Sequence, residues 1–273
     1  MASPKEPQQA PSSSSKGYDL IDRGSRAPSP LGTTLFTVLR ALDPLLQYQI
    51  LRHGLGSGFL HRMGLKARLP GFVLQTGIPP LDGLGLSPHR LLLLAMATGG
   101  SLKQIYWLLG TSYESFGPGA ALALVAYNTA FNTVNNLIFT LPGLSAALPG
   151  ELATAPAVAL GVVLYVVGMG VEVVSEQQRY NFKKKPENKG KVFTGGLFRL
   201  SRHANYAGFT LWRTGYCLAA GGWIWGATAF AYLFALFALS SIPILDDYCG
   251  KKYGKSWKAF KEKTPYRLFP YIY

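Results

Sequence analysis

Long apolar blocks constrain the fold of this chain more than any other feature of its sequence. A membrane-spanning helix needs about 20 predominantly apolar residues. Only 15% of the 273 residues are charged, against about a quarter in soluble domains. The candidate spans are residues 34–51, 90–110, 118–141, 155–175, 205–223 and 225–245. The sequence therefore predicts an all-α, polytopic integral membrane bundle with about six spans.

The remaining segments divide the chain into three parts. Residues 1–33 are rich in Pro, Ser, Gln and Lys, and this composition predicts a disordered cytosolic arm. Residues 34–164 should form N-terminal membrane helices on the substrate side, interrupted by a glycine- and proline-rich loop with a short interfacial helix near Phe59–Leu65. Residues 165–273 should form a C-terminal membrane region that carries the chemistry.

Positive charge gathers in two short segments of the C-terminal part. The formal net charge is +14, and residues 179–202 carry eight Lys/Arg while residues 246–273 carry seven, together 15 of 27. The apolar hairpin between them should turn near Gly221–Gly226 and bring both segments to one side. An excess of Lys and Arg is typical of the cytoplasmic face, so we expect both segments to be cytosolic. The apolar character of the rest of the chain argues against a nucleic-acid partner.

The third predicted span carries amides on one helical face. Asn128, Asn132 and Asn135 recur at helical spacing, and unpartnered amides are costly in hydrocarbon. Two interpretations fit this pattern. The amides could hydrogen-bond neighbouring helices, or they could form the polar wall of a substrate cavity.

The residues that offer chemistry lie in the C-terminal part. The lysines of residues 183–191 precede a glycine turn and could hold a phosphate or bind anionic lipid headgroups. Arg202, His203, Asn205 and Tyr206 place a cation, an imidazole, an amide and a phenol at the entry to a span. The two cysteines are too few for a zinc site, and the sequence predicts neither a metal nor a disulfide.

The C-terminal tail has a pattern of its own. Residues 246–260 predict a basic, amphipathic interfacial helix with Tyr253, Trp257 and Phe260 on one side. The prolines and aromatic residues of residues 264–273 predict an ordered, packed terminus.

Together these segments resemble the C-terminal region of the steroid 5-alpha-reductase and sterol reductase superfamily, over about residues 165–273. Three motifs carry the resemblance: an acid–acid–Gln pattern, an RH-x-NY-x-G turn and a C-x3-YG-x2-W…PYR-x2-PYIY ending. The matching residues are Glu172, Glu176, Gln178, Arg202, His203, Asn205, Tyr206, Gly208, Cys249, Tyr253, Gly254, Trp257, Pro265, Tyr266, Arg267 and Pro270–Tyr273.

The resemblance implies an NADPH-dependent reductase of a carbon–carbon double bond in a membrane-dissolved steroid, sterol or polyprenoid, located in the endoplasmic reticulum. It implies Tyr206 and His203 as candidate proton donors. Asn128, Asn132 and Asn135 lie outside the resembling region and are candidate substrate contacts on their helical spacing alone. The implied cofactor-binding residues are Glu172, Gln178, Lys183, Lys191, Arg202, Asn205, Tyr206, Asp246, Tyr253 and Trp257.

The chain departs from the reductase pattern at two places. Phe209 follows the glycine of the turn where reductases usually have an acid, and Ile244 and Leu245 replace an Arg-Asp pair, although Asp246 is adjacent. The same region also resembles isoprenylcysteine and phospholipid methyltransferases, which use S-adenosylmethionine. Three functions therefore stay open: a reductase, a methyltransferase and a non-catalytic lipid-binding membrane protein.

Overall fold

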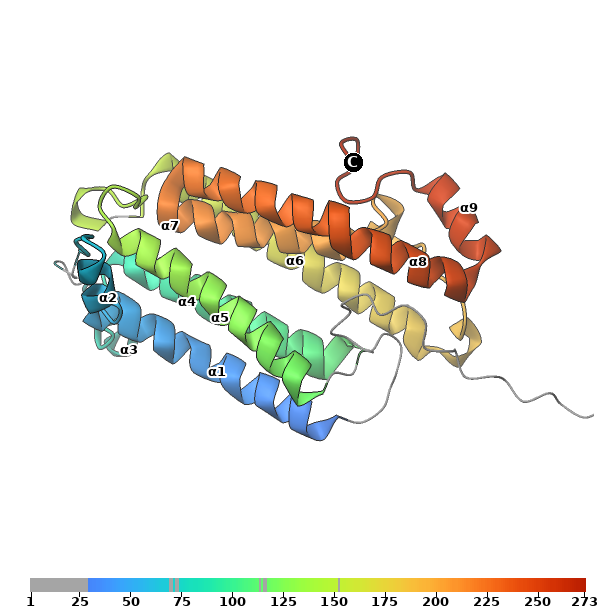
Figure 1. The fold of residues 1–273 in the computed structure, drawn as a ribbon, viewed down its shortest axis with the longest axis horizontal. Coiled ribbons are helices and arrows are strands. Elements are labelled where there is room, and N and C mark those ends of the chain that lie inside the picture. Colours follow the sequence, from blue (N-terminus) through green and yellow to red (C-terminus); the bar gives the residue numbers. More distant parts are fainter. Residues whose placement is uncertain (1–28, 69–70, 72–73, 113, 115–116, 152) are drawn as a thin grey trace, which may run out of the picture.

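The computed structural model is a helical bundle (Figure 1). It describes residues 29–68, 71, 74–112, 114, 117–151 and 153–273. Within these ranges no β-strand occurs, which confirms the all-α fold class. Residues 1–28, which hold most of the predicted arm, lie outside the described residues.

Five long helices form the body of the bundle. They are α1 (Pro30–His53), α4 (Pro88–Tyr106), α5 (Pro118–Thr140), α6 (Pro156–Lys184) and α7 (Ala204–Leu236). Shorter elements are α2 (Ser57–Arg62), α3 (Pro79–Asp82), α8 (Ile242–Tyr253), α9 (Lys255–Lys263), the π-helical turns η1 (Trp107–Thr111) and η5 (Phe237–Ser241), and the 3-10 turns η2 (Pro149–Glu151), η3 (Pro186–Asn188) and η4 (Gly196–Arg199). Four long helices begin with a proline, because the first turn of a helix needs no backbone donor there.

Each of the six predicted spans coincides with a helical stretch. By length and hydropathy, two helical runs of the described chain could cross a membrane: Pro156–Lys184 and Ala204–Tyr253. The second run doubles back at Gly222, whose φ of 70° and ψ of −163° interrupt α7 inside the predicted turn. Tyr206 accordingly stacks on Phe237 with ring centroids 4.5 Å apart, across the two antiparallel arms. The count of about six spans stays a prediction.

Glycines set the distance between α6 and the first arm of α7. A Cβ added to Gly208 would lie 2.6 Å from the backbone nitrogen of Glu172 and 2.7 Å from the carbonyl oxygen of Gly168. Gly161 and Gly215 approach each other in the same way, one heptad further along each helix. Small residues at such spacing let two membrane helices pack backbone to backbone. This close approach positions the side chains of α6 opposite those of α7.

A buried polar network joins α1 to α4, α5 and α7. Arg40 and Asp43 of α1 form an ion pair at 3.4 Å, and both side chains are inaccessible to solvent. Asn132 of α5 donates to Asp43 at 2.6 Å and accepts from Arg213 of α7 at 2.7 Å. Buried charges persist only when such partners satisfy them, so the network fixes the register of these helices.

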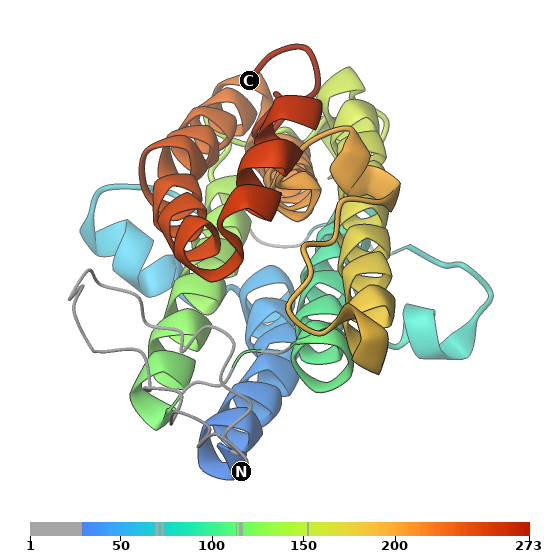
Figure 2. The ribbon, with the colours of Figure 1, turned by 90° about the vertical axis from the view of Figure 1, so that its right-hand side faces the viewer.

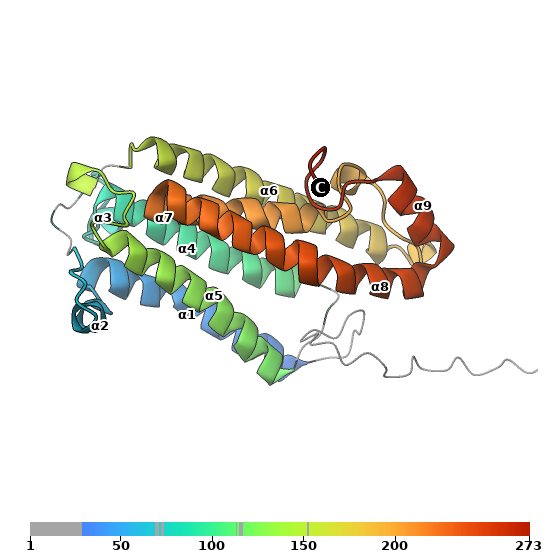
Figure 3. The same cartoon turned by 45° about the horizontal axis from the view of Figure 1, so that its top comes forward.

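The two basic segments meet at one end of the bundle. Figure 2 looks at this end, where α9 and the loop before α7 cover the tips of α6 and α8. The helix α9 differs from the prediction of an interfacial helix, because its apolar residues Trp257 and Phe260 are buried against Phe198 and Cys249. Figure 3 shows the C-terminus folded back over the same end, as predicted for an ordered tail.

Candidate functional site

Two adjoining cavities open at the end of the bundle that carries α8 and α9. The first, called the basic cleft, is lined by Glu114, Arg179, Lys183, Val192, Phe193, Phe198, Arg202, His203, Asn205, Leu245, Tyr248, Cys249, Lys252, Tyr253, Trp257 and Phe260. The second, called the chamber, is lined by Phe36, Lys103, Gln104, Trp107, Glu114, Leu124, Tyr127, Asn128, Glu172, Glu176, Arg179, Asn205, Tyr206, Phe209, Leu236, Phe237, Ser241 and Leu245. Four residues line both cavities and form their junction: Glu114, Arg179, Asn205 and Leu245.

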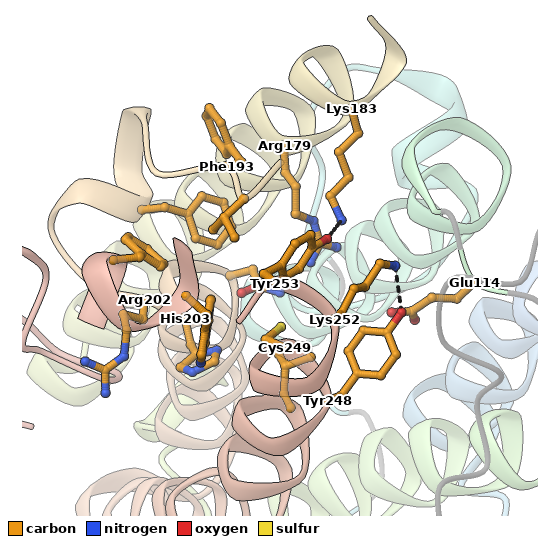
Figure 4. Close-up of a pocket in the computed structure, with 16 residues that line it drawn as sticks. Glu114, Arg179, Lys183, Phe193, Arg202, His203, Tyr248, Cys249, Lys252 and Tyr253 are labelled. Atoms are coloured by element: carbon orange, nitrogen blue, oxygen red, sulfur yellow. Dashed lines mark hydrogen bonds between the residues drawn. The ribbon is translucent and has the colours of Figure 1, made fainter. Parts of the chain in front are cut away.

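Cations dominate the charge of the basic cleft. Arg179 and Lys183 come from α6, Arg202 precedes α7, and Lys252 comes from α8. Figure 4 shows these side chains spread around Tyr253 and Cys249. Four cations face one carboxylate, that of Glu114, so the lining carries a formal charge of +3 (4 − 1). A lining of this sign attracts a polyanion and opposes a cation.

Hydrogen bonds hold the aromatic walls of the cleft in place. The ammonium of Lys183 lies 3.4 Å from the Tyr253 hydroxyl, and that of Lys252 donates to the Tyr248 hydroxyl at 2.8 Å. The indole of Trp257 donates to Asp246 at 2.6 Å. Asp246 does not line the cleft itself, and its contribution is to hold the indole of Trp257 in place.

The C-terminal segment fixes the RH turn at the cleft. The backbone N–H groups of Arg202 and His203 donate to the carbonyls of Tyr266 and Arg267, each at 3.0 Å. The guanidinium of Arg202 also donates to the carbonyl of Thr264 at 2.8 Å. These bonds hold the turn against a segment that lies 62 residues further along the chain.

Two polar atoms of this turn have no partner among the described residues. They are Nε of Arg202 and Nε2 of His203, both buried. Burial and the neighbouring Arg202 lower the pKa of His203 to about 3, so its imidazole is neutral near pH 7. Burial also lowers the pKa of Arg202. A buried guanidinium with an unused donor suits an anionic oxygen, so the cleft fits the phosphate part of a nucleotide.

A carboxylate organises the junction. Glu176 of α6 accepts from the amide of Asn205 at 2.7 Å and from the guanidinium of Arg179 at 2.5 Å. The Asn205 side chain thus has its nitrogen turned to Glu176. Since Arg179 and Asn205 line both cavities, a ligand in the cleft and a ligand in the chamber would meet beside them.

The chamber combines apolar walls with a few polar groups. Its volume is about 310 Å³, at the lower end for a pocket that holds a small molecule. Trp107 of η1 and Phe237 of η5 both line it, and π-helical turns are frequent at functional sites. Among its lining residues, Glu172 forms a buried ion pair with Lys103 and accepts from the indole of Trp212 at 2.6 Å.

The structure brings some of the predicted site residues to the cavities and leaves others outside. The cleft receives Lys183, Arg202, His203, Asn205, Tyr253 and Trp257, and the chamber receives Asn128, Glu172, Asn205 and Tyr206. Gln178 instead accepts from the backbone of Leu197 at 2.9 Å, and Lys191 is exposed away from both cavities. Asn132 bonds Asp43 and Arg213, and Asn135 accepts from Trp225 at 2.6 Å.

Sequence reasoning missed several residues that line the cavities. Glu114 comes from the loop between α4 and α5, where no pattern marks it. Tyr248 and Lys252 lie within the predicted interfacial helix of residues 246–260, and no pattern there marks them as site residues. Gln104 lies within the predicted span 90–110, where no pattern marks it as a site residue. For Arg179 a signal existed, since a cation one helical turn beyond Glu176 faces the same way.

Comparison with known proteins places the chain in a class. The family model described as "Protein of unknown function (DUF1295)" matches residues 120–264, over half of the chain. A "7-dehydrocholesterol reductase" of Xenopus laevis is 29% identical over 161 residues, and a "Delta(14)-sterol reductase ERG24B" of Gibberella zeae is 24% identical over 227 residues. The chain therefore belongs to the DUF1295 family, within the steroid and sterol reductase superfamily.

The relatives differ in how much of them the chain covers. The matches cover 50% and 63% of this chain but only 34% and 47% of the two sterol reductases. A "Probable O-methyltransferase ustE" of Ustilaginoidea virens is 40% identical over 240 residues, which are 87% of this chain and 84% of that protein.

Proposed function

We propose that this protein is a membrane enzyme that uses NADPH to reduce a carbon–carbon double bond in a lipid. One observation carries the proposal: a cleft of formal charge +3 adjoins a largely apolar chamber, and both open onto Arg179 and Asn205. NADPH carries a pyrophosphate and a 2′-phosphate, whereas the lipid is apolar. Each cavity suits one of these ligands, and the junction is where they would react.

Charged and aromatic side chains of the cleft would bind different parts of the cofactor. Lys183 and Arg202 are placed to hold phosphates, and the unused Nε of Arg202 offers a donor. Tyr253 and Trp257 provide flat aromatic faces beside them. When bound, NADPH supplies a hydride to one carbon of the double bond.

The neighbouring carbon then needs a proton, and Tyr206 is the candidate donor. Its ring is held between His203, at 5.5 Å between centroids, and Phe237, at 4.5 Å, and the residue lines the chamber. His203 lines the cleft and not the chamber, and its imidazole is neutral. We assign it the role of orienting Tyr206 rather than that of supplying the proton.

Methyl transfer is the second candidate, and the 40% identity to a protein named as a probable O-methyltransferase favours it. Phe209 also fits that reading, because it lines the chamber where reductases usually have an acid. Against it stands the charge of the cleft. S-adenosylmethionine carries a sulfonium cation and no phosphate, so a lining of +3 opposes its binding.

Binding of the two cofactors separates the two functions. The detergent-solubilised chain is titrated with NADPH and, separately, with S-adenosylmethionine, and heat release is measured at two salt concentrations. We expect NADPH to bind, more weakly at high salt because the contacts are ionic. Binding of S-adenosylmethionine alone would favour the methyltransferase, and binding of neither would favour a lipid-binding protein without catalysis.

The orientation in the membrane belongs to the same proposal. The segments 179–202 and 246–273 lie at one end of the bundle, and their charge favours the cytosolic side of the endoplasmic reticulum. Reporter tags inserted after residue 190 and at the C-terminus should both be read on the cytosolic side. Tags that report opposite sides would refute this orientation.

A further inference from the structure

Residues 268–273, called the tail hairpin, lie against the second arm of α7. Phe269 stacks on Phe230 and Phe234, with ring centroids 5.8 and 6.5 Å apart. Tyr273 meets the ring of Phe234 edge-on at 5.4 Å. In Figure 3 the C-terminus accordingly lies nearer the middle of the bundle than α9 does. The hairpin therefore turns back along the bundle instead of extending from its end.

The two phenylalanines beneath the hairpin belong to an uncharged stretch of helix. Residues 222–245 contain no charged side chain. Phe234 and Phe230 precede Asp246, the first charge, by 12 and 16 residues, which is roughly 18 and 24 Å along a helix. Hydrocarbon surrounds such a stretch in a membrane-spanning protein. Phe230 is 37% exposed, so the surface beside the hairpin is open to lipid.

The tip of the hairpin presents apolar surface. Tyr271 and Ile272 are 87% and 79% exposed. The backbone at Tyr271 adopts a left-handed φ of 64°, which closes the turn. An aromatic ring and a branched aliphatic side chain, exposed together beside an uncharged helix, suit contact with lipid.

The polar backbone groups of the hairpin pair with one another. The N–H groups of Leu268 and Phe269 donate to the backbone oxygen of Tyr273 at 2.7 and 3.1 Å. The N–H groups of Ile272 and Tyr273 donate to the carbonyl of Phe269 at 3.2 and 3.1 Å. Pro270 has no N–H to satisfy. Non-helical backbone is tolerated at membrane depth only where its polar groups have partners and protein packs against it, and the hairpin meets both conditions.

A cation marks the level at which the hairpin leaves the lipid. Arg267 is exposed, and its guanidinium donates to the hydroxyl of Tyr273 at 3.0 Å and lies 5.4 Å from the centroid of that ring. Long cationic side chains beside an apolar segment carry their charge to the lipid headgroups. The ring of Tyr266 lies 5.0 Å from that of Tyr271, and tyrosines are enriched at the same level of a membrane.

The residues just before the hairpin hold the turn of the basic cleft. The carbonyls of Tyr266 and Arg267 accept from the backbone of the turn that begins at Arg202. We propose that the tail hairpin inserts Tyr271 and Ile272 among the acyl chains of the leaflet nearest the cleft, and that this contact anchors the turn to the membrane.

Quenching of a fluorescent label locates the tip. An environment-sensitive dye is attached to the thiol of Tyr271→Cys, Ile272→Cys or Ala259→Cys, and the full chain is placed in lipid nanodiscs. Cys217 and Cys249 are buried, and labelling of wild type gives their background. Ala259 is exposed on α9, whose apolar side faces the protein, so it is the control at the same end of the bundle.

We expect phospholipid brominated on its acyl chains to quench the labels of Tyr271→Cys and Ile272→Cys, and iodide in the buffer to have little effect on them. The order should reverse for Ala259→Cys. Quenching of the two tail labels by iodide and not by brominated lipid would overturn the proposal, because the tip would then lie in water. Quenching by neither agent would also overturn it, because protein would then cover the tip.

Amide hydrogen exchange tests the anchoring of the turn. Ile272→Asp places a charge at the tip, which the leaflet disfavours, and Ala259→Asp places the same charge on the outer side of α9. Exchange of the backbone N–H groups of Arg202 and His203 in nanodiscs should become about tenfold faster in Ile272→Asp and stay at the wild-type rate in Ala259→Asp. An unchanged rate in Ile272→Asp, or the same change in both variants, would refute the link between the lipid contact and the turn. Neither measurement includes nucleotide or substrate, so both outcomes are independent of the proposed function.

Discussion

The contact between α6 and α7 makes a sharp prediction about two glycines of the same helix. A Cβ at Gly168 would lie 2.7 Å from the carbonyl oxygen of Gly208 and closer still to the backbone nitrogen of Trp212. Ordinary contact begins at 3.4 Å, so the backbones must separate by at least 0.7 Å (3.4 − 2.7). A Cβ at Gly170 would meet nothing within 4 Å.

The expected changes in stability have opposite signs. Overpacking costs about 1–3 kcal/mol, so Gly168→Ala should lower the free energy of unfolding despite the better helix propensity of alanine. Gly170→Ala should raise it by about 0.5–1 kcal/mol, because alanine loses less backbone entropy in a helix. Thermal unfolding of both variants in one detergent measures the difference. Equal changes in the two melting temperatures would refute the close approach of α6 and α7.

Three further predictions concern the cleft and its turn. The pKa of His203 is lowered to about 3 in the folded protein. As pH falls, the imidazole is therefore protonated in the unfolded chain before it is protonated in the folded protein. The free energy of unfolding should thus drop by about 2 kcal/mol between pH 6.5 and 5, and denaturant unfolding of His203→Phe should lack this component. Lys183→Gln should weaken NADPH binding about tenfold to a hundredfold, whereas Lys185→Gln, exposed outside the cleft, should leave calorimetric titrations unchanged. Tyr206→Phe should lower turnover by about 10²–10⁴ at unchanged NADPH affinity; undiminished turnover would exclude Tyr206 as the proton donor.

Hydropathy was enough to find the helices of this fold. Each apolar block became a helix, and the turn of the last hairpin fell at Gly222, because length and composition are local properties of the sequence. What the apolar face of a helix packs against depends on residues that are distant in the sequence. The apolar face of α9 was correctly placed on Trp257 and Phe260, yet it covers the cleft instead of facing lipid, since Phe198 and Cys249 lie beneath it.

The site was predictable only where one stretch of sequence carries it. The turn with Arg202 and Asn205 was found because its residues are adjacent and resemble a known pattern. Glu114 and Gln104 reach the cavities from separate helices and loops, so only tertiary packing reveals them. The amides of α5 illustrate the same limit. One periodic face serves two purposes, since Asn128 lines the chamber while Asn132 bonds Asp43 and Arg213.

Transfer of an isotope to a lipid tests the central claim most directly. The solubilised protein is incubated with a lipid extract, NADPH deuterated at C4 of the nicotinamide, and S-adenosylmethionine with a deuterated methyl group, and the lipids are analysed by mass spectrometry. The proposed reduction predicts a saturated product that carries one deuterium on carbon, and the yield of this product at subsaturating NADPH should fall in Lys183→Gln. A product that instead carries the intact deuterated methyl group, with no deuterium from NADPH, would contradict the account.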